Sequence, residues 1–133
     1  MTESHRLHEA HIQGRGIDPA DAYSVELTCE PDGVRLLVLA GELDMAAAPA
    51  VRTCVDEAAG TRGLVIDLAG VTFIDSSMLK ELLRAAAELD RYETRLVLAG
   101  VADTVRRLLD LTKATGMFTL APDREAALRQ LRG

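Results

Sequence analysis

The feature that most constrains the fold of this chain is a regular alternation of short apolar runs with amphipathic segments. The apolar runs have the length and residue types of β-strands, and the segments between them carry apolar residues at helical spacing. Strands joined by helices pair in parallel with right-handed connections, so the pattern predicts one α/β domain with a mostly parallel sheet. We expect about five strands and four helices. The strands are expected at residues 24–29, 34–40, 64–68, 94–99 and 117–120, and the helices at 47–59, at 76–90, from 103 and after 123.

The first two expected strands form an N-terminal hairpin. Apolar and polar residues alternate from Ser24 to Cys29, which is typical of a half-buried strand. Pro31-Asp32-Gly33 then predicts a turn. Val34 to Ala40 is apolar except for Arg35, and this run predicts a strand covered on both faces and paired with the first.

Residues 1–22 are polar and lack a sustained periodicity, so we expect a flexible N-terminal leader followed by a domain at 23–133. His5, His8 and His11 recur every third residue in this leader, and a helical turn would bring two of them within reach of one metal ion. No Cys or carboxylate completes a defined coordination set, so a solvated tail is the preferred interpretation and no metal is expected.

The chain is acidic, with a formal net charge of −6 and a pI near 5.0. A nucleic-acid surface needs clustered Lys and Arg, so DNA binding is not expected. No apolar run is long enough to span a bilayer and no secretory signal is evident, which favours a cytoplasmic protein. Cys29 and Cys54 form no C-x-x-C pair, and we expect both to be buried free thiols.

The stretch from Val71 to Leu83 is the candidate functional site. In this stretch a mostly apolar run is followed by Asp75-Ser76-Ser77, and the apolar residues after these have helical spacing. The pattern predicts a helix that Ser76 or Ser77 caps. The expected inward face of this helix consists of Leu79, Leu82, Leu83 and Ala86. Capping alone explains these polar residues, but a hydroxyl at a helix N-terminus also lies where backbone N–H groups and the helix dipole accommodate a phosphate.

Acidic residues are expected beside this serine. In open α/β sheets the loops at the carboxyl ends of the strands share one rim, which would bring Glu42 and Asp44 towards Asp75 and Ser76. Glu42 and Asp44 are either part of the site or simply a solvated rim, and the pattern favours neither.

Several chemistries lack the residues that they need. Every histidine lies in the leader, so no general base accompanies a serine nucleophile, and G-x-S-x-G, GxGxxG and GxxxxGK[ST] are all missing. A phospho-aspartate receiver would need an acidic pair after the first strand and a lysine after the last, whereas Asp67 lies inside its strand and is expected to cap or brace a neighbouring loop. We therefore predict neither an enzyme nor a cofactor.

Four short motifs resemble one known family. They are Leu39-Ala40-Gly41-Glu42-Leu43-Asp44, Val65-Ile66-Asp67-Leu68 followed by Phe73-Ile74-Asp75-Ser76-Ser77, Val105-Arg106-Arg107-Leu108-Leu109, and Phe118-Thr119-Leu120. From about Val25 to Leu131 the chain resembles the STAS domain of bacterial anti-sigma factor antagonists.

The resemblance implies a regulatory function. Ser76 corresponds to the serine that an anti-sigma factor with serine kinase activity phosphorylates, and a serine phosphatase reverses the modification. The unphosphorylated antagonist binds the anti-sigma factor, frees the sigma factor and regulates transcription, and phosphorylation releases it. The partner surface implied by the resemblance comprises Glu42, Asp44, Asp75, Ser77 and Met78.

The chain departs from the family pattern after the serines. Met78 and Lys80 stand where the family usually has Gly, and Lys113 stands at another such position. Met78 either packs inward or projects into the interface and selects a different partner. Two alternatives therefore stay open: a STAS scaffold that works without phosphorylation, and a sensor with a ligand pocket between the sheet and a helix.

Overall fold

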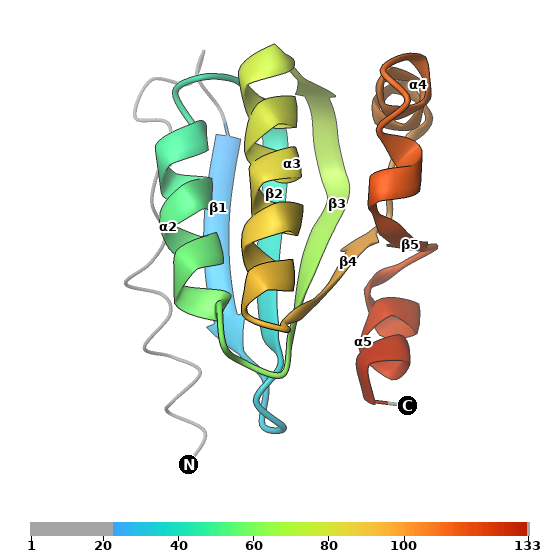
Figure 1. The fold of residues 1–133 in the computed structure, drawn as a ribbon. Helices are drawn as coiled ribbons and strands as arrows, with labels where there is room; N and C mark the ends of the chain where they lie inside the picture. The colour runs from blue at the N-terminus through green and yellow to red at the C-terminus, as the bar shows by residue number, and fades with distance from the viewer. Residues whose placement is uncertain (1–22, 133) are drawn as a thin grey trace.

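A computed structural model describes residues 23–132, which form one five-stranded sheet flanked by helices (Figure 1). The strands are β1 (Tyr23–Cys29), β2 (Arg35–Leu43), β3 (Gly63–Ile74), β4 (Arg95–Ala99) and β5 (Thr119–Ala121). The helices are α2 (Ala48–Ala58), α3 (Ser76–Arg91), α4 (Asp103–Leu111) and α5 (Arg124–Arg132), with a 3₁₀ turn at Thr115–Met117.

The strands lie in chain order across the sheet. β1 pairs with β2 in antiparallel fashion, and every later neighbour is parallel. The predicted α/β fold, with its hairpin and its mostly parallel sheet, is confirmed.

The sheet is buried on both faces. α2 and α3 lie side by side over one face (Figure 1), and together with Val105 and Leu109 of α4 they build the larger core. α5 covers the other face with Ala127, Leu128 and Leu131. The run in β2 contributes to both cores, which confirms that this strand is covered on both sides.

Two strand boundaries differ clearly from the prediction. β3 continues to Ile74, well past the predicted end at Leu68, because pairing with β2 persists although Ala69, Gly70 and Thr72 interrupt the apolar run. The expected last strand at 117–120 begins only at Thr119, since the residues before it form the 3₁₀ turn.

The predicted inward face of α3 is confirmed in part. Leu79 and Leu82 are buried, but Leu83 and Ala86 remain partly exposed. The buried stripe is rotated towards other positions, namely Met78, Glu81, Ala85 and Leu89.

The two cysteines differ in environment. Cys54 is fully buried in the larger core, as predicted, whereas Cys29 is partly exposed because it ends β1 opposite Arg35. The Arg35 guanidinium lies 2.8 Å from the Cys29 sulfur. The prediction that both thiols are buried is therefore wrong for Cys29.

The expected leader, with its three histidines, lies outside the described residues. Within residues 23–132, no group of His, Cys, Asp and Glu side chains is arranged to hold a metal ion. Among the helices that the structure describes, none combines the length and the apolar character needed to cross a membrane.

Candidate functional site

The N-terminus of α3 is capped by Asp75 and not, as predicted, by Ser76 or Ser77. Asp75 has extended backbone angles (φ −102°, ψ −177°), and its Oδ1 accepts a hydrogen bond of 2.9 Å from the backbone N–H of Met78. All three consecutive residues are good caps, so the sequence alone did not distinguish them. Ser76 is consequently the first residue of the helix itself.

Ser76 is accessible. Its side chain is exposed at the start of α3, and no other residue in the described part of the chain hydrogen-bonds to its hydroxyl group. Ser77, one position further, is only partly exposed. At the first turn of a helix the backbone N–H groups and the helix dipole favour a negative group, so a phosphate on Ser76 would be compatible with the fold.

The loop after β2 follows an irregularity in the sheet. The register between β2 and β3 shifts between Gly41 and Glu42, and Gly41 adopts φ +88°, a conformation that a glycine reaches without strain. Beyond the shift Leu43 is fully buried, whereas Glu42 and Asp44 are exposed. The bulge thus anchors the loop through its leucine and directs both acids to solvent.

Asp75 joins this loop to the helix. Its backbone N–H donates to the Leu43 carbonyl over 3.2 Å, and its Oδ2 accepts from the Met45 backbone N–H over 3.2 Å. Asp44 closes the turn itself, because its Oδ1 accepts from the Ala46 N–H at 2.9 Å. The expectation that the Gly41–Asp44 segment lies beside Asp75 and Ser76 is therefore confirmed.

The resulting rim is acidic. Glu42 and Asp44 make no ion pair with another described residue, and Asp75 uses its carboxylate for backbone N–H groups. A doubly charged group on Ser76 would add to three nearby carboxylates, and the exposed Lys80 is one turn further along α3.

Met78 does not belong to the surface of this site. Its side chain has no exposed area and packs in the larger core with Leu79 and Leu82. Of the two alternatives, inward packing is the one that the structure shows, and the expectation of a direct partner contact by Met78 is corrected. Met78 is the third residue of α3. Its backbone N–H donates the capping hydrogen bond to Asp75, and its side chain faces the sheet.

The other two departures from the family pattern, Lys80 and Lys113, lie in different structural environments. Lys80 is exposed on α3. Lys113 has φ +61°, in the left-handed region that glycine adopts more readily than any other residue. A glycine at position 113 would adopt this backbone conformation with less strain than Lys113 does.

Asp67 is a structural residue. It is nearly buried, its Oδ1 accepts from the Ala69 N–H at 3.0 Å, and its Oδ2 lies 2.9 Å from both Nε and Nη2 of Arg124 in α5. The prediction that Asp67 caps or braces a neighbouring loop is wrong: its partners are Ala69 in its own strand and Arg124 in α5, and the ion pair to α5 was not suggested by the sequence.

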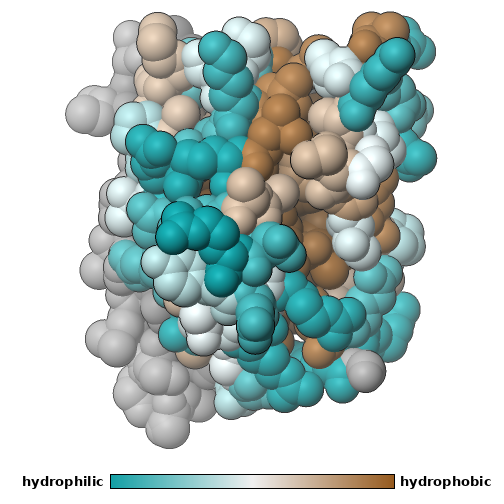
Figure 2. Space-filling model, viewed as in Figure 1, coloured by the Kyte–Doolittle hydropathy of each residue, from teal (hydrophilic) through white to brown (hydrophobic). Residues whose placement is uncertain are grey.

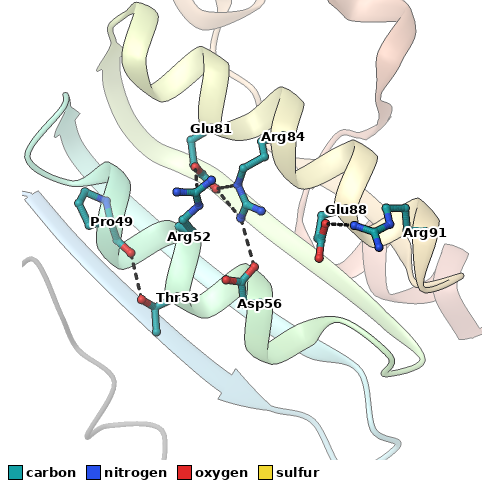
Figure 3. A network of polar contacts seen from close by, with 8 residues as sticks. All are labelled: Pro49, Arg52, Thr53, Asp56, Glu81, Arg84, Glu88 and Arg91. Carbon is teal, nitrogen blue, oxygen red and sulfur yellow. Dashed lines mark hydrogen bonds and ion pairs between the residues drawn. The ribbon is translucent and has the colours of Figure 1, made fainter.

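A second ion-pair group, also absent from the sequence reasoning, joins α2 to α3 (Figure 3). Glu81 is nearly buried and pairs with Arg84 at 2.9 Å and with Arg52 at 3.8 Å. Arg84 also reaches Asp56 at 3.3 Å. The pKa of the Arg84 guanidinium is raised, chiefly by its hydrogen bond to Glu81, and its ion pair with Asp56 joins α3 to α2.

Comparison with protein families matches residues 27–127 to the STAS domain. Among curated proteins, an anti-sigma-B factor antagonist of Listeria monocytogenes serovar 1/2a is 33% identical over 78 residues, covering 57% of this chain and 68% of that protein. Among solved structures, an anti-sigma factor antagonist from Mycobacterium paratuberculosis has a TM-score of 0.75 and 29% identity, covering 87% of this chain and 98% of that one. The phosphorylated form of the Bacillus cell fate determinant SpoIIAA has a TM-score of 0.67 at 22% identity, over 81% of this chain and 99% of that one, and shares the fold.

Proposed function

Because the chain belongs to the STAS domain family, as its G-E-L-D and F-I-D-S-S motifs suggested, we propose that it is an anti-sigma factor antagonist controlled by phosphorylation of Ser76. The observation that carries this proposal is the placement of one exposed hydroxyl at the start of α3, a helix end that Asp75 links to the acidic loop. The names of the Listeria and Mycobacterium relatives support the same class of function.

In this proposal the unphosphorylated rim is the binding surface. Glu42, Asp44 and Asp75, together with the partly exposed Ser77, contact an anti-sigma factor that has serine kinase activity. Met78 does not reach this surface and influences it only through its packing in the core at the first turn of α3. Bound in this way, the anti-sigma factor releases its sigma factor and transcription proceeds.

Phosphorylation would oppose this complex electrostatically. A phosphoserine carries about −1.5 to −2 charge units and three acceptor oxygens, which would be added to a rim of three carboxylates. The helix N-terminus can hold the new group, so the fold need not rearrange. A coupling of about 1–3 kcal/mol changes affinity roughly 5- to 150-fold, which is sufficient for a switch. A serine phosphatase would restore the binding form.

The proposal is tested by incubating the protein with its cognate kinase and ATP and locating phosphate by mass spectrometry. We expect the label on Ser76 and no label on a Ser76→Ala variant, while the neighbouring Ser77→Ala variant serves as the matched control and is still labelled. Absence of phosphate at Ser76 in the unaltered protein would contradict the proposal.

A binding measurement separates the switch from a scaffold. Ser76→Asp should lose most of its affinity for the anti-sigma factor, whereas Ser76→Ala should bind like the unaltered protein. Equal affinity of both variants would favour a STAS scaffold that operates without phosphorylation.

A further inference from the structure

The carboxyl-terminal part of β3 has an open edge. Pairing between β3 and β4 ends at Asp67 and Ala99, whereas pairing between β3 and β2 continues to Ile74 (Figure 1). Gly100 packs against Ala69 and covers the beginning of the edge, so residues 70–74 lack a neighbouring strand on that side within the described chain. Every second residue of such an edge presents an unpaired backbone N–H and C=O group.

A groove lies between this part of β3 and α4. Thr72, Phe73 and Ile74 form one wall, and the α4 wall consists of Thr104, Val105, Arg107, Leu108 and Leu111, around a cavity of about 280 Å³. Phe73 is 51% exposed and Leu111 is 75% exposed, so both walls of the groove present a large apolar side chain to solvent, and such a contiguous apolar surface is typical of an interaction site. Hydrophobic residues also gather in a column beside α3 on the face shown in Figure 2.

The groove carries one charge. Arg107 is the charged residue among those lining it, and it forms no ion pair with any residue between 23 and 132. The guanidinium groups of Arg84 and Arg124, in contrast, are both paired with carboxylates. An occupant that matches the groove therefore has apolar side chains and a carboxylate at the position of Arg107.

We propose that this groove binds an extended segment of a partner protein, which adds to the open edge of β3 as a further strand. An extended segment pairs its backbone with the free N–H and C=O groups of residues 70–74 and points alternate side chains towards Phe73 and Leu111. A helical segment satisfies its own backbone and would leave this edge unpaired. The groove begins at Ile74, two residues before Ser76, but the interaction does not require phosphorylation.

The probe for this proposal is a random peptide library selected against the full chain. We expect enriched peptides with apolar residues at every second position and an acidic residue among them. Fluorescence anisotropy of an enriched peptide should show at least about a tenfold weaker affinity for Arg107→Glu and for Leu111→Glu. The matched controls are Arg106→Glu, on the same helix but outside the groove lining, and Met117→Glu, an exposed apolar residue elsewhere; both should bind like the unaltered protein.

Backbone pairing is tested by methylating alternate amide nitrogens of the enriched peptide. Methylation in one of the two alternating phases should abolish binding, because those N–H groups face β3, and the amides of residues 70–74 should exchange hydrogen more slowly in the complex. The proposal is overturned if no peptide is enriched, if the selected spacing is helical, or if both methylated peptides still bind. All of these measurements use the protein with Ser76 unmodified. Their outcome therefore does not depend on whether the proposed phosphorylation switch is correct.

Discussion

The carboxylate of Asp75 is the residue on which the geometry of the site depends. One oxygen caps α3 at Met78, and the other holds the loop at Met45, 30 residues earlier in the chain. A single side chain therefore sets both the direction in which Ser76 is presented and the distance of the acidic loop from it.

Replacing Asp75 by Ala should lower the free energy of unfolding by about 1–2 kcal/mol, because a helix cap and a loop contact are lost together. Asp75→Asn retains a capping oxygen and should lose less. Urea denaturation measures both effects.

The matched control for Asp75 is Asp123, which accepts a hydrogen bond from the Ala126 N–H at the start of α5. Asp123→Ala should destabilise the fold similarly and leave anti-sigma factor binding unchanged, whereas Asp75→Ala should weaken both. Equal binding by the two variants would show that the loop is positioned without Asp75.

Cys54 links stability to alkaline pH. Burial raises the pKa of its thiol from 9.0 to about 12, with a smaller contribution from the charge of Glu57. The unfolded chain loses this proton above about pH 9 while the folded chain keeps it, so stability is complete below pH 9 and falls as pH rises towards 12. The gap in unfolding free energy between the unaltered protein and Cys54→Ala should therefore narrow over this range. A gap that stays constant would mean that the thiol does not titrate differently in the two states.

At the scale of elements, the α2–α3 pair is held by apolar packing and by the nearly buried carboxylate of Glu81 (Figure 3). The side chain of Glu81 is 8% exposed, whereas Arg84 is 25% and Arg52 is 58% exposed. Solvent screening at the two arginines reduces the energy of these pairs below that of a fully buried ion pair.

Glu81→Ala should therefore lower the free energy of unfolding by about 1–3 kcal/mol, since it leaves Arg84 without its closest partner. Glu88→Ala, which breaks the more exposed pair with Arg91 on the same helix, should cost only a few tenths of a kcal/mol, roughly 0.5 or less. A double-mutant cycle on Glu81 and Arg84 measures the coupling directly. If Glu81→Ala and Glu88→Ala lowered the free energy of unfolding by equal amounts, the Glu81 network would contribute nothing beyond an ordinary surface pair.

The elements themselves were largely predictable, because each has its own hydrophobic period and its own boundary residues. Pro49 and Gly60 delimit α2, and Gly60 has the left-handed φ of +87° that ends a helix. The extension of β3 was not predictable, because Ala69 and Gly70 are poor strand formers that interrupt the run and are held in the strand by pairing with β2. Around the candidate site, the position of the Gly41–Asp44 loop beside Asp75 was predictable from the sequence. The cap position, the burial of Met78 and the Glu81 network were not, because they depend on how α3 packs against its neighbours.

At the scale of the whole molecule, the proposed switch would operate on a chain that is already acidic, with a formal net charge of −6. In this proposal, negative charge added at Ser76 would act on a partner through a rim that includes the exposed carboxylates of Glu42 and Asp44, and such fields are screened by salt over about 10 Å at 0.1 M. The core below this rim is closely packed up to Leu43, Ile74 and Met78. Added charge at the rim is therefore not expected to change the fold.

This reasoning predicts a salt-dependent effect without a structural change. Ser76→Asp should shift backbone amide resonances only around the start of α3 and the Gly41–Asp44 loop, and should weaken anti-sigma factor binding roughly 5- to 150-fold at low salt. The loss of affinity should shrink as ionic strength rises, because the repulsion involves exposed groups.

Ser77→Asp is the matched control for this prediction. It adds the same charge one residue away at a partly exposed position, and its effect on affinity should be smaller if the hydroxyl of Ser76 is the gating group. A loss of affinity that is independent of salt, or resonance shifts that spread through the sheet, would indicate that phosphorylation acts by changing the fold and not by charge at the rim.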